Sequence, residues 1–216
     1  MRMIVRFGKN PRLRFISHLD LQRFFQRALN RTGLPIAFSQ GFNPHPVMAF
    51  ASALALGWTS DYEVLDVRLS APIGRKRAED AMRAALPGDL PVIQVKMVED
   101  RLPSLMPMVY ASEYRIDNSG VTEEMLADFR AQETVTAVRR TKSGEREINI
   151  RPLAYDLRLD GDALIAKLAL TDKDTLKPDL LVKTLTGKEN EELRIHRIAL
   201  LAKGEGGELA PLMERL

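Results

Sequence analysis

The chain contains no cysteine among its 216 residues. This absence excludes disulfide bonds, zinc sites built from thiolates, a cysteine nucleophile and iron–sulfur clusters held by cysteine. Histidine is also scarce: the sequence has His18, His45 and His196, so a histidine metal site would need side chains from distant segments. We therefore expect neither a metal nor another cofactor.

Long apolar runs are missing as well. The longest, from Val47 to Trp58, is interrupted by Ser52 and Gly57 and is shorter than the roughly 20 residues of a membrane-spanning helix. The N-terminal residues lack the apolar stretch of a secretory signal. The sequence thus predicts a cytoplasmic protein without a membrane partner, and its length allows one large domain or two smaller ones.

Acidic residues are nearly absent from the first 60 positions, where Asp20 stands against eight lysines and arginines. The overall charge of +3 hides this uneven distribution. Seven of the eight phenylalanines lie in the first 50 residues. Arginines neutralise phosphates and aromatic rings stack on unpaired bases, so this composition is typical of a nucleic-acid-binding surface. Core packing is the alternative explanation for most of these phenylalanines.

The hydrophobic pattern predicts two successive β-α-β-β-α-β units. In the first, strands are expected at 2–8, 35–39, 63–69 and 92–98, and helices at 18–32 and 75–86. In the second, strands are expected at 109–116, 155–159, 163–170 and 193–202, helices at 122–132 and 177–185, and an added hairpin at 134–150 that turns at Lys142-Ser143-Gly144. This order predicts the α+β class, as two tandem ferredoxin-like units with antiparallel sheets. We expect domains at 1–100 and 101–203, followed by a glycine-rich, flexible tail at 204–216.

The segment from Phe38 to Pro46 reads Phe-Ser-Gln-Gly-Phe-Asn-Pro-His-Pro. Its glycine permits a positive φ, and its two prolines stiffen the chain and remove amide donors. Core packing does not require this combination, so we interpret the segment as half of a binding site. The candidate residues here are Ser39, Gln40, Gly41, Phe42, Asn43 and His45.

The helix expected from His18 supplies the other half of the site. Ser17 is placed to cap it together with Asp20, and Arg23, Arg27 and Arg31 follow at four-residue spacing on one face. We expect the helix start and the 38–46 segment to converge, so that free amides, cations and two imidazoles surround an anion. The candidate residues on this side are Arg14, Ser17, His18, Asp20, Arg23 and Arg27.

Several stretches resemble an uncharacterised bacterial family, the radical-SAM-linked proteins, whose members occur alone or fused to radical S-adenosylmethionine (radical SAM) enzymes. They are Arg14-Phe15-Ile16-Ser17-His18-Leu19-Asp20, the 34–46 segment that ends in Asn-Pro-His-Pro, and Glu147-Ile148-Asn149-Ile150-Arg151-Pro152. The family usually has Asp-Ile-Arg-Pro in the last stretch, so Asn149 is a departure that argues against a general base or metal ligand there. Asn149 and Arg151 alternate along the expected strand and would share a face, and they complete the candidate residues.

The resemblance implies a radical SAM enzyme as partner, which this cysteine-free chain would assist but not replace. Three functions are open. The first is an accessory module that binds RNA or a nucleotide-like anion in an RNA-modification or RNA-processing system. Phosphates would be neutralised by Arg12, Arg14, Arg23 and Arg27, and Phe42 would stack on a base. The second is a metal-independent RNA-processing enzyme with His18 and His45 as acid and base. The third is an interaction adaptor for the radical SAM enzyme. We favour binding over catalysis by this chain alone.

Overall fold

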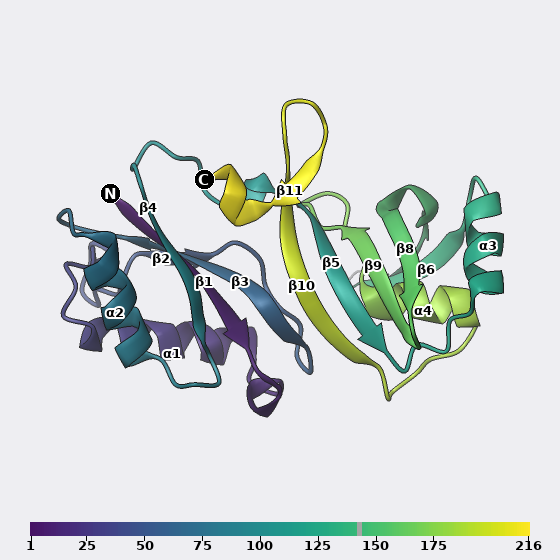
Figure 1. The fold of residues 1–216 in the computed structure, drawn as a ribbon, viewed down its shortest axis with the longest axis horizontal. Coiled ribbons are helices and arrows are strands. Elements are labelled where there is room, and N and C mark those ends of the chain that lie inside the picture. Colours follow the sequence, from purple (N-terminus) through teal and green to yellow (C-terminus); the bar gives the residue numbers. More distant parts are fainter. Residues whose placement is uncertain (142–143) are drawn as a thin grey trace. The chain divides into compact units, whose positions relative to one another are not determined.

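The computed structural model describes residues 1–141 and 144–216 and is an α+β structure with mostly antiparallel strands. It divides into two compact units, with residues 1–109 and 202–216 in unit 1 and residues 110–201 in unit 2 (Figure 1). The boundary predicted at residue 100 therefore lies inside unit 1, which also includes the C-terminal residues. Lys142 and Ser143, where the sequence predicts a hairpin turn, lie outside the described residues.

Unit 1 has the element order β-α-β-β-α-β. Its elements are β1 (Arg2–Lys9), the 3-10 turn η1 (Pro11–Leu13), α1 (His18–Arg31), β2 (Met48–Phe50), β3 (Thr59–Arg68), α2 (Arg75–Ala85), β4 (Val92–Val98) and η2 (Met106–Met108). The strands run in the order β4-β1-β3, with β2 paired to β3. The strand predicted at 35–39 is absent: Ile36 and Phe38 form isolated bridges, because Pro35 and Pro46 lack the amides that a ladder needs.

The core of unit 1 lies between its sheet and its two helices (Figure 1). The apolar stripe of α1 is buried as the 3.6-residue period predicts, and the rings of Phe7 and Phe25 are 4.7 Å apart. Ser17 caps the helix by accepting the Asp20 amide at 3.2 Å, and Gly33, with φ of +63°, follows its end. Burying each large apolar side chain contributes roughly 1.5–3 kcal/mol, so this stripe fixes α1 on the sheet.

Residues 202–216, which comprise the end of β10 (Arg194–Lys203), β11 (Leu209–Pro211) and η4 (Leu212–Arg215), belong to unit 1 and pack on the face of its sheet that carries Tyr62 and Lys96. The prediction of a flexible tail at 204–216 is corrected here. Leu212 and Met213 are buried, and the Met213 amide donates to the Tyr62 hydroxyl at 3.0 Å. Lys96 donates to the Met213 carbonyl at 2.6 Å. The apolar residues that follow the glycines therefore dock the segment.

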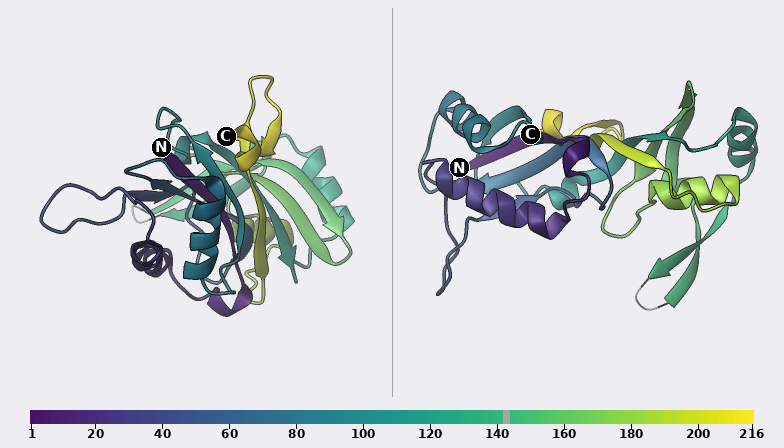
Figure 2. Two further views of the ribbon diagram at one scale, coloured as in Figure 1. Left: turned by 60° about the vertical axis from the view of Figure 1, so that its left-hand side comes forward. Right: turned by 90° about the horizontal axis from the view of Figure 1, so that it is seen from below.

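Unit 2 repeats the order of unit 1 with a hairpin added. Its elements are β5 (Val109–Asp117), α3 (Glu123–Ala131), β6 (Thr136–Thr141), β7 (Gly144–Asn149), η3 (Arg151–Leu153), β8 (Ala154–Asp160), β9 (Ala163–Ala169), α4 (Pro178–Thr186) and β10. The strand order is β10-β5-β9-β8, and β6 and β7 form a separate two-stranded sheet. This hairpin projects from unit 2 in the right-hand view of Figure 2. None of the helices in the described ranges is both long and apolar enough to cross a membrane.

Candidate nucleic-acid interface

Residues 38–46, which we name the projecting loop, extend away from the sheet and helices of unit 1 (Figure 2). Backbone hydrogen bonds fix the base of the loop: the Ala37 amide donates to the Arg68 carbonyl at 2.9 Å, and the Val47 amide donates to the Ala37 carbonyl at 2.8 Å. Gly41, near the tip, has a φ of +128°, a backbone conformation that residues other than glycine rarely adopt.

A serine–histidine pair stabilises the inside of the projecting loop. The Ser39 amide donates to the His45 carbonyl at 2.9 Å, and the Ser39 hydroxyl accepts the His45 amide at 3.2 Å. The same hydroxyl lies 3.0 Å from His45 Nδ1. When the hydroxyl donates its proton to Nδ1, the ring carries its own proton on Nε2, which then serves as a hydrogen-bond donor.

Two aromatic rings of the projecting loop face solvent. Phe42 is 105% exposed relative to a reference residue and Phe38 is 45% exposed. Gln40 and Asn43 are exposed beside them. Because a fully exposed phenylalanine contributes nothing to the core, the tip of the loop offers an apolar ring and polar groups to a partner.

The exposed side of α1 continues this chemistry. Leu19, Arg23 and Arg27 follow at four-residue spacing and share a helix face, and Arg31 follows them. Asp20 forms a 2.7 Å hydrogen bond with Ser17 and a 3.3 Å ion pair with Arg23. Within the described chain, Arg27 and Arg31 have no ion pair or hydrogen bond from their side chains.

The turn before α1 adds another exposed ring. Phe15 is 69% exposed and lies 4.6 Å beneath the guanidinium of Arg14. We name the exposed set around this turn and helix the α1 surface; it consists of Arg12, Arg14, Phe15, Leu19, Arg23, Arg27 and Arg31. The sequence did not single out Phe15 and Leu19. The position of Leu19 outside the apolar stripe is a signal that could have identified it.

His18 belongs to the support of this surface rather than to its exposed side. Its half-buried ring lies edge-on to Phe50 at 5.1 Å. Burial lowers the pKa of His18, the carboxylate of Glu63 opposes this shift and the cation of Lys9 adds to it. Lys9 is buried and donates to the Ile16 carbonyl at 3.0 Å, and burial also lowers its pKa. The buried lysine thereby holds the turn that leads into α1.

The two halves expected to converge do not meet. Strands β1 and β3 are antiparallel, with Lys9 opposite Ser60 at one end and Arg2 opposite Arg68 at the other. The start of α1 lies at the Lys9 end, whereas the projecting loop is bonded to Arg68. Arg68 lies eight residue steps along β3 from Ser60, a distance of about 25 Å. His18 and His45 therefore do not form the predicted acid–base pair.

Asn149 and Arg151 lie in unit 2 and do not alternate along one strand. Ile150 adopts helical angles, φ of −90° and ψ of −12°, so β7 ends at Asn149 and Arg151 begins η3. The side-chain oxygen of Asn149 accepts the Val135 amide at 3.0 Å and the Arg151 amide at 3.1 Å. The predicted shared face is therefore wrong, because the extended strand ends at Asn149 and the backbone turns at Ile150.

The family model DUF2344, described as an uncharacterised protein conserved in bacteria, matches residues 2–201. The chain belongs to this family. No curated protein matches it. Among solved structures, one chain of "Crystal Structure of a Cbf5-Nop10-Gar1 Complex" is similar, with a TM-score of 0.45 and 9% identity over 90% of this chain, which spans 47% of that chain's length.

The description of DUF2344 names neither a ligand nor a radical-enzyme partner, so that partner stays a prediction. Across residues 1–141 and 144–216, no three histidine, aspartate or glutamate side chains gather closely enough to hold a metal ion. The α1 surface and the projecting loop present exposed arginines, aromatic rings and polar side chains.

Proposed function

We propose that this chain binds RNA as an extended single strand along the α1 surface and the projecting loop, as an accessory module of an RNA-modification or RNA-processing system. One observation carries the proposal: exposed rings lie at both ends of α1, Phe15 at its start and Phe42 beyond its end, with arginines along the helix between them. The 14 residues of α1 span about 21 Å. A compact ligand cannot contact both ends, whereas a polymer can.

The available charge supports a polyanion as ligand. Three basic residues of the N-terminal segment have structural roles: Arg2 pairs with Asp66 at 2.5 Å, Arg6 lies 4.0 Å above the Tyr62 ring, and Lys9 is buried. The other five, Arg12, Arg14, Arg23, Arg27 and Arg31, are exposed. Asp20 is the acid among them, so the surface keeps a net positive charge that attracts phosphates.

The location of the site also follows from what covers the sheet. We infer that both units have the ferredoxin-like fold, because their strand orders are equivalent. Many RNA-binding domains of related architecture stack bases on aromatic residues of the open sheet face. In unit 1 that face is occupied by the C-terminal segment, through Leu212 and Met213. RNA would therefore use the helix and loop rather than the sheet.

The test is the binding of an unstructured RNA oligonucleotide to the full chain, followed by fluorescence anisotropy. We expect Phe42→Ala and Phe15→Ala each to weaken binding about fivefold or more, since stacking on a base contributes roughly 1–3 kcal/mol. Met106→Ala, which removes a 54% exposed apolar side chain elsewhere, serves as the control and should bind as the wild type does. If the wild-type chain does not bind the RNA oligonucleotide in about 50 mM salt, where phosphate contacts are strong, the proposal is wrong.

A second function, docking on a radical SAM enzyme, is favoured by the apolar character of the same loop. Phe38 and Phe42 are 45% and 105% exposed, and exposed aromatic residues are frequent anchors of protein interfaces. Capture of an iron–sulfur enzyme from nuclease-treated bacterial lysate, lost with Phe42→Ala, would favour docking if the pure chain binds no RNA.

A further inference from the structure

Residues of the β6–β7 hairpin help to line two cavities in the described part of unit 2. The first, of about 560 Å³, lies between β6, α4 and residues 189–193. The second, of about 640 Å³, lies between β7, η3, the start of β8 and residues 171–174. Arg139 lines both and donates to the Thr175 carbonyl. Each cavity is large enough for a small-molecule ligand.

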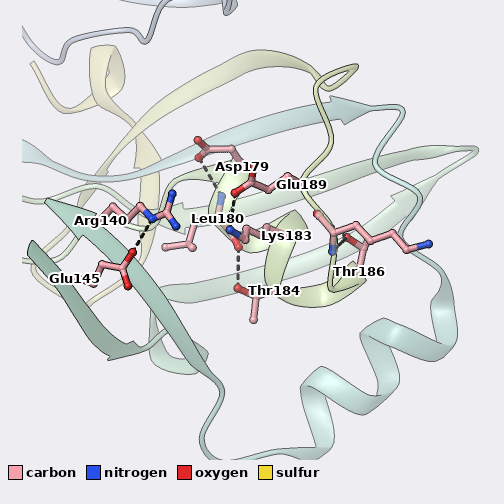
Figure 3. A network of polar contacts seen from close by, with 9 residues as sticks. Arg140, Glu145, Asp179, Leu180, Lys183, Thr184, Thr186 and Glu189 are labelled. Carbon is pink, nitrogen blue, oxygen red and sulfur yellow. Dashed lines mark hydrogen bonds and ion pairs between the residues drawn. The ribbon is translucent and has the colours of Figure 1, made fainter.

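The first cavity has few unsatisfied groups. Arg140 donates to Glu145 at 2.8 Å, and Lys183 donates to Glu189 at 2.6 Å (Figure 3). These pairs neutralise two of its cations, and Figure 3 also shows the Asp179 carboxylate accepting the Leu180 amide at 3.0 Å. Three of its lining cations, Arg139, Arg140 and Lys183, therefore already have partners among the described residues.

The second cavity differs from the first in whether its cations are paired. Arg146 and Lys173 are exposed, and neither has a hydrogen bond or ion pair with any other residue that the structure describes. Glu147 and Asp174 also line the cavity, so its charge is mixed and it would not bind every anion equally. Two unpaired cations that line the same cavity are suited to bind one phosphate group.

A stacked pair of tyrosines forms one wall of the second cavity. The rings of Tyr110 and Tyr155 are 5.7 Å apart and inclined by 16°. Burial raises the pKa of Tyr155, and a hydrogen bond to Tyr110 adds to the shift, so the phenol is neutral near pH 7. Tyr155 is 39% exposed, and its ring is therefore available to a planar ligand while Tyr110 supports it from the other side.

Asn149 provides a fixed donor in the same cavity. Its side-chain oxygen accepts two backbone amides, from Val135 and Arg151, which locks the plane of the amide group. Its Nδ2 group donates to no other described residue, and Asn149 lines the cavity. A locked amide with an unused N–H group is a suitable partner for an acceptor atom on a base or sugar.

We propose that the second cavity binds a nucleoside phosphate. The base stacks on Tyr155, the phosphate lies between Arg146 and Lys173, and Asn149 Nδ2 donates to an acceptor of the nucleoside. The site uses residues of unit 2 alone and is independent of RNA binding by unit 1. The same nucleoside phosphate chemistry has two sources, a free mononucleotide or a nucleotide of an RNA strand.

Isothermal titration calorimetry on the full chain tests the proposal. The ligands are each of the four ribonucleoside 5′-monophosphates and a 5′-phosphorylated RNA oligonucleotide. We expect Tyr155→Ala to weaken binding about fivefold or more, because the stack is lost, and Tyr155→Phe to retain it. Arg146→Gln, an exposed change that leaves the fold intact, should also weaken binding. Arg140→Gln is the matched control, since it removes a cation of the same hairpin that is already paired with Glu145.

The two kinds of ligand, mononucleotide and oligonucleotide, distinguish a free nucleotide from a nucleotide of an RNA strand. Mononucleotide binding that depends on Tyr155 and Arg146 indicates a free nucleotide, and oligonucleotide binding alone with this dependence indicates an RNA strand. If no ligand binds at millimolar concentration, or if Arg146→Gln binds all ligands as the wild type does, the proposal is wrong. Phe42→Ala distinguishes the two sites. If this variant loses RNA binding but binds mononucleotides as the wild type does, the unit 2 site is independent of the unit 1 site. Either proposal can then be wrong while the other is right.

Discussion

The phenylalanines of unit 1 differ sharply in exposure, and we expect their replacement to differ as sharply in its effect on the free energy of unfolding. Phe25 is 0% exposed in the core, so Phe25→Ala should lower the free energy of unfolding by about 3–5 kcal/mol. Phe42→Ala, at the tip of the projecting loop, should change it by less than about 0.5 kcal/mol. Urea denaturation of both variants checks this. A large loss of stability in Phe42→Ala would contradict a binding role for that ring.

The sequence indicated where aromatic residues are concentrated but not which of them are exposed. Phe25 lies on the helical stripe, and periodicity alone placed it in the core. Phe15 lies in a turn, where no period applies, and its exposure depends on how Lys9 holds that turn. Side chains in irregular segments are therefore the part of the candidate site that the sequence could not assign.

His18 makes the stability of unit 1 depend on pH. Burial lowers its pKa in the folded state below the ordinary value of 6.5, so the unfolded chain binds the proton more readily. The free energy of unfolding should therefore be greatest above pH 6.5 and should fall as the pH drops below it. His18→Gln should show a smaller fall. Urea denaturation at about pH 7.5 and about pH 5.5 measures the difference, and an equal fall in both proteins would exclude this contribution.

At the scale of elements, the caps of the helices give a further prediction. Ser17 caps α1 and Thr122 caps α3 through hydrogen bonds to the amides of Asp20 and Met125, at 3.2 Å and 3.3 Å. Ser17→Ala should lower the free energy of unfolding by about 1 kcal/mol, and Ser17→Asn, which retains an acceptor, should restore most of it. Thermal denaturation followed by circular dichroism measures both. Equal stability of the alanine and asparagine variants would show that the cap contributes little.

Helices were easier to predict than strands or site geometry. The cap at Ser17 is confirmed, because a 3.6-residue period and a polar cap are local signals. The strand at 35–39 was wrong because Pro35 and Pro46, which lies opposite Phe38, lack the amides that a ladder needs. The convergence of His18 with His45 failed for a topological reason: α1 begins at the Lys9 end of β1 and carries the chain back to the other end, so the loop that follows it lies far from its start.

At the scale of the molecule, the C-terminal segment is part of unit 1. Leu212 is 0% exposed although it follows a glycine-rich stretch, which composition alone marks as flexible. Leu212→Ala should lower the free energy of unfolding by about 2–5 kcal/mol, because it leaves a cavity under the segment. Glu205→Ala, an exposed change in the same segment, is the control. Urea denaturation that gives the two variants equal stability would show that the segment does not support the fold.

The distribution of charge over the whole chain predicts how salt affects RNA binding. Each arginine that contacts a phosphate of a single strand contributes about 0.7 to the slope of log affinity against log salt concentration. Replacing Arg23, Arg27 and Arg31 by glutamine should therefore reduce this slope by about 2. Lys76→Gln with Arg83→Gln is the matched control, because these α2 cations pair with Asp80 and Glu79 at 2.5 Å and 2.7 Å. Anisotropy titrations at several salt concentrations give the slopes. If the α1 and α2 variants lose equal amounts, the charge that binds RNA is spread over unit 1 and does not lie along α1.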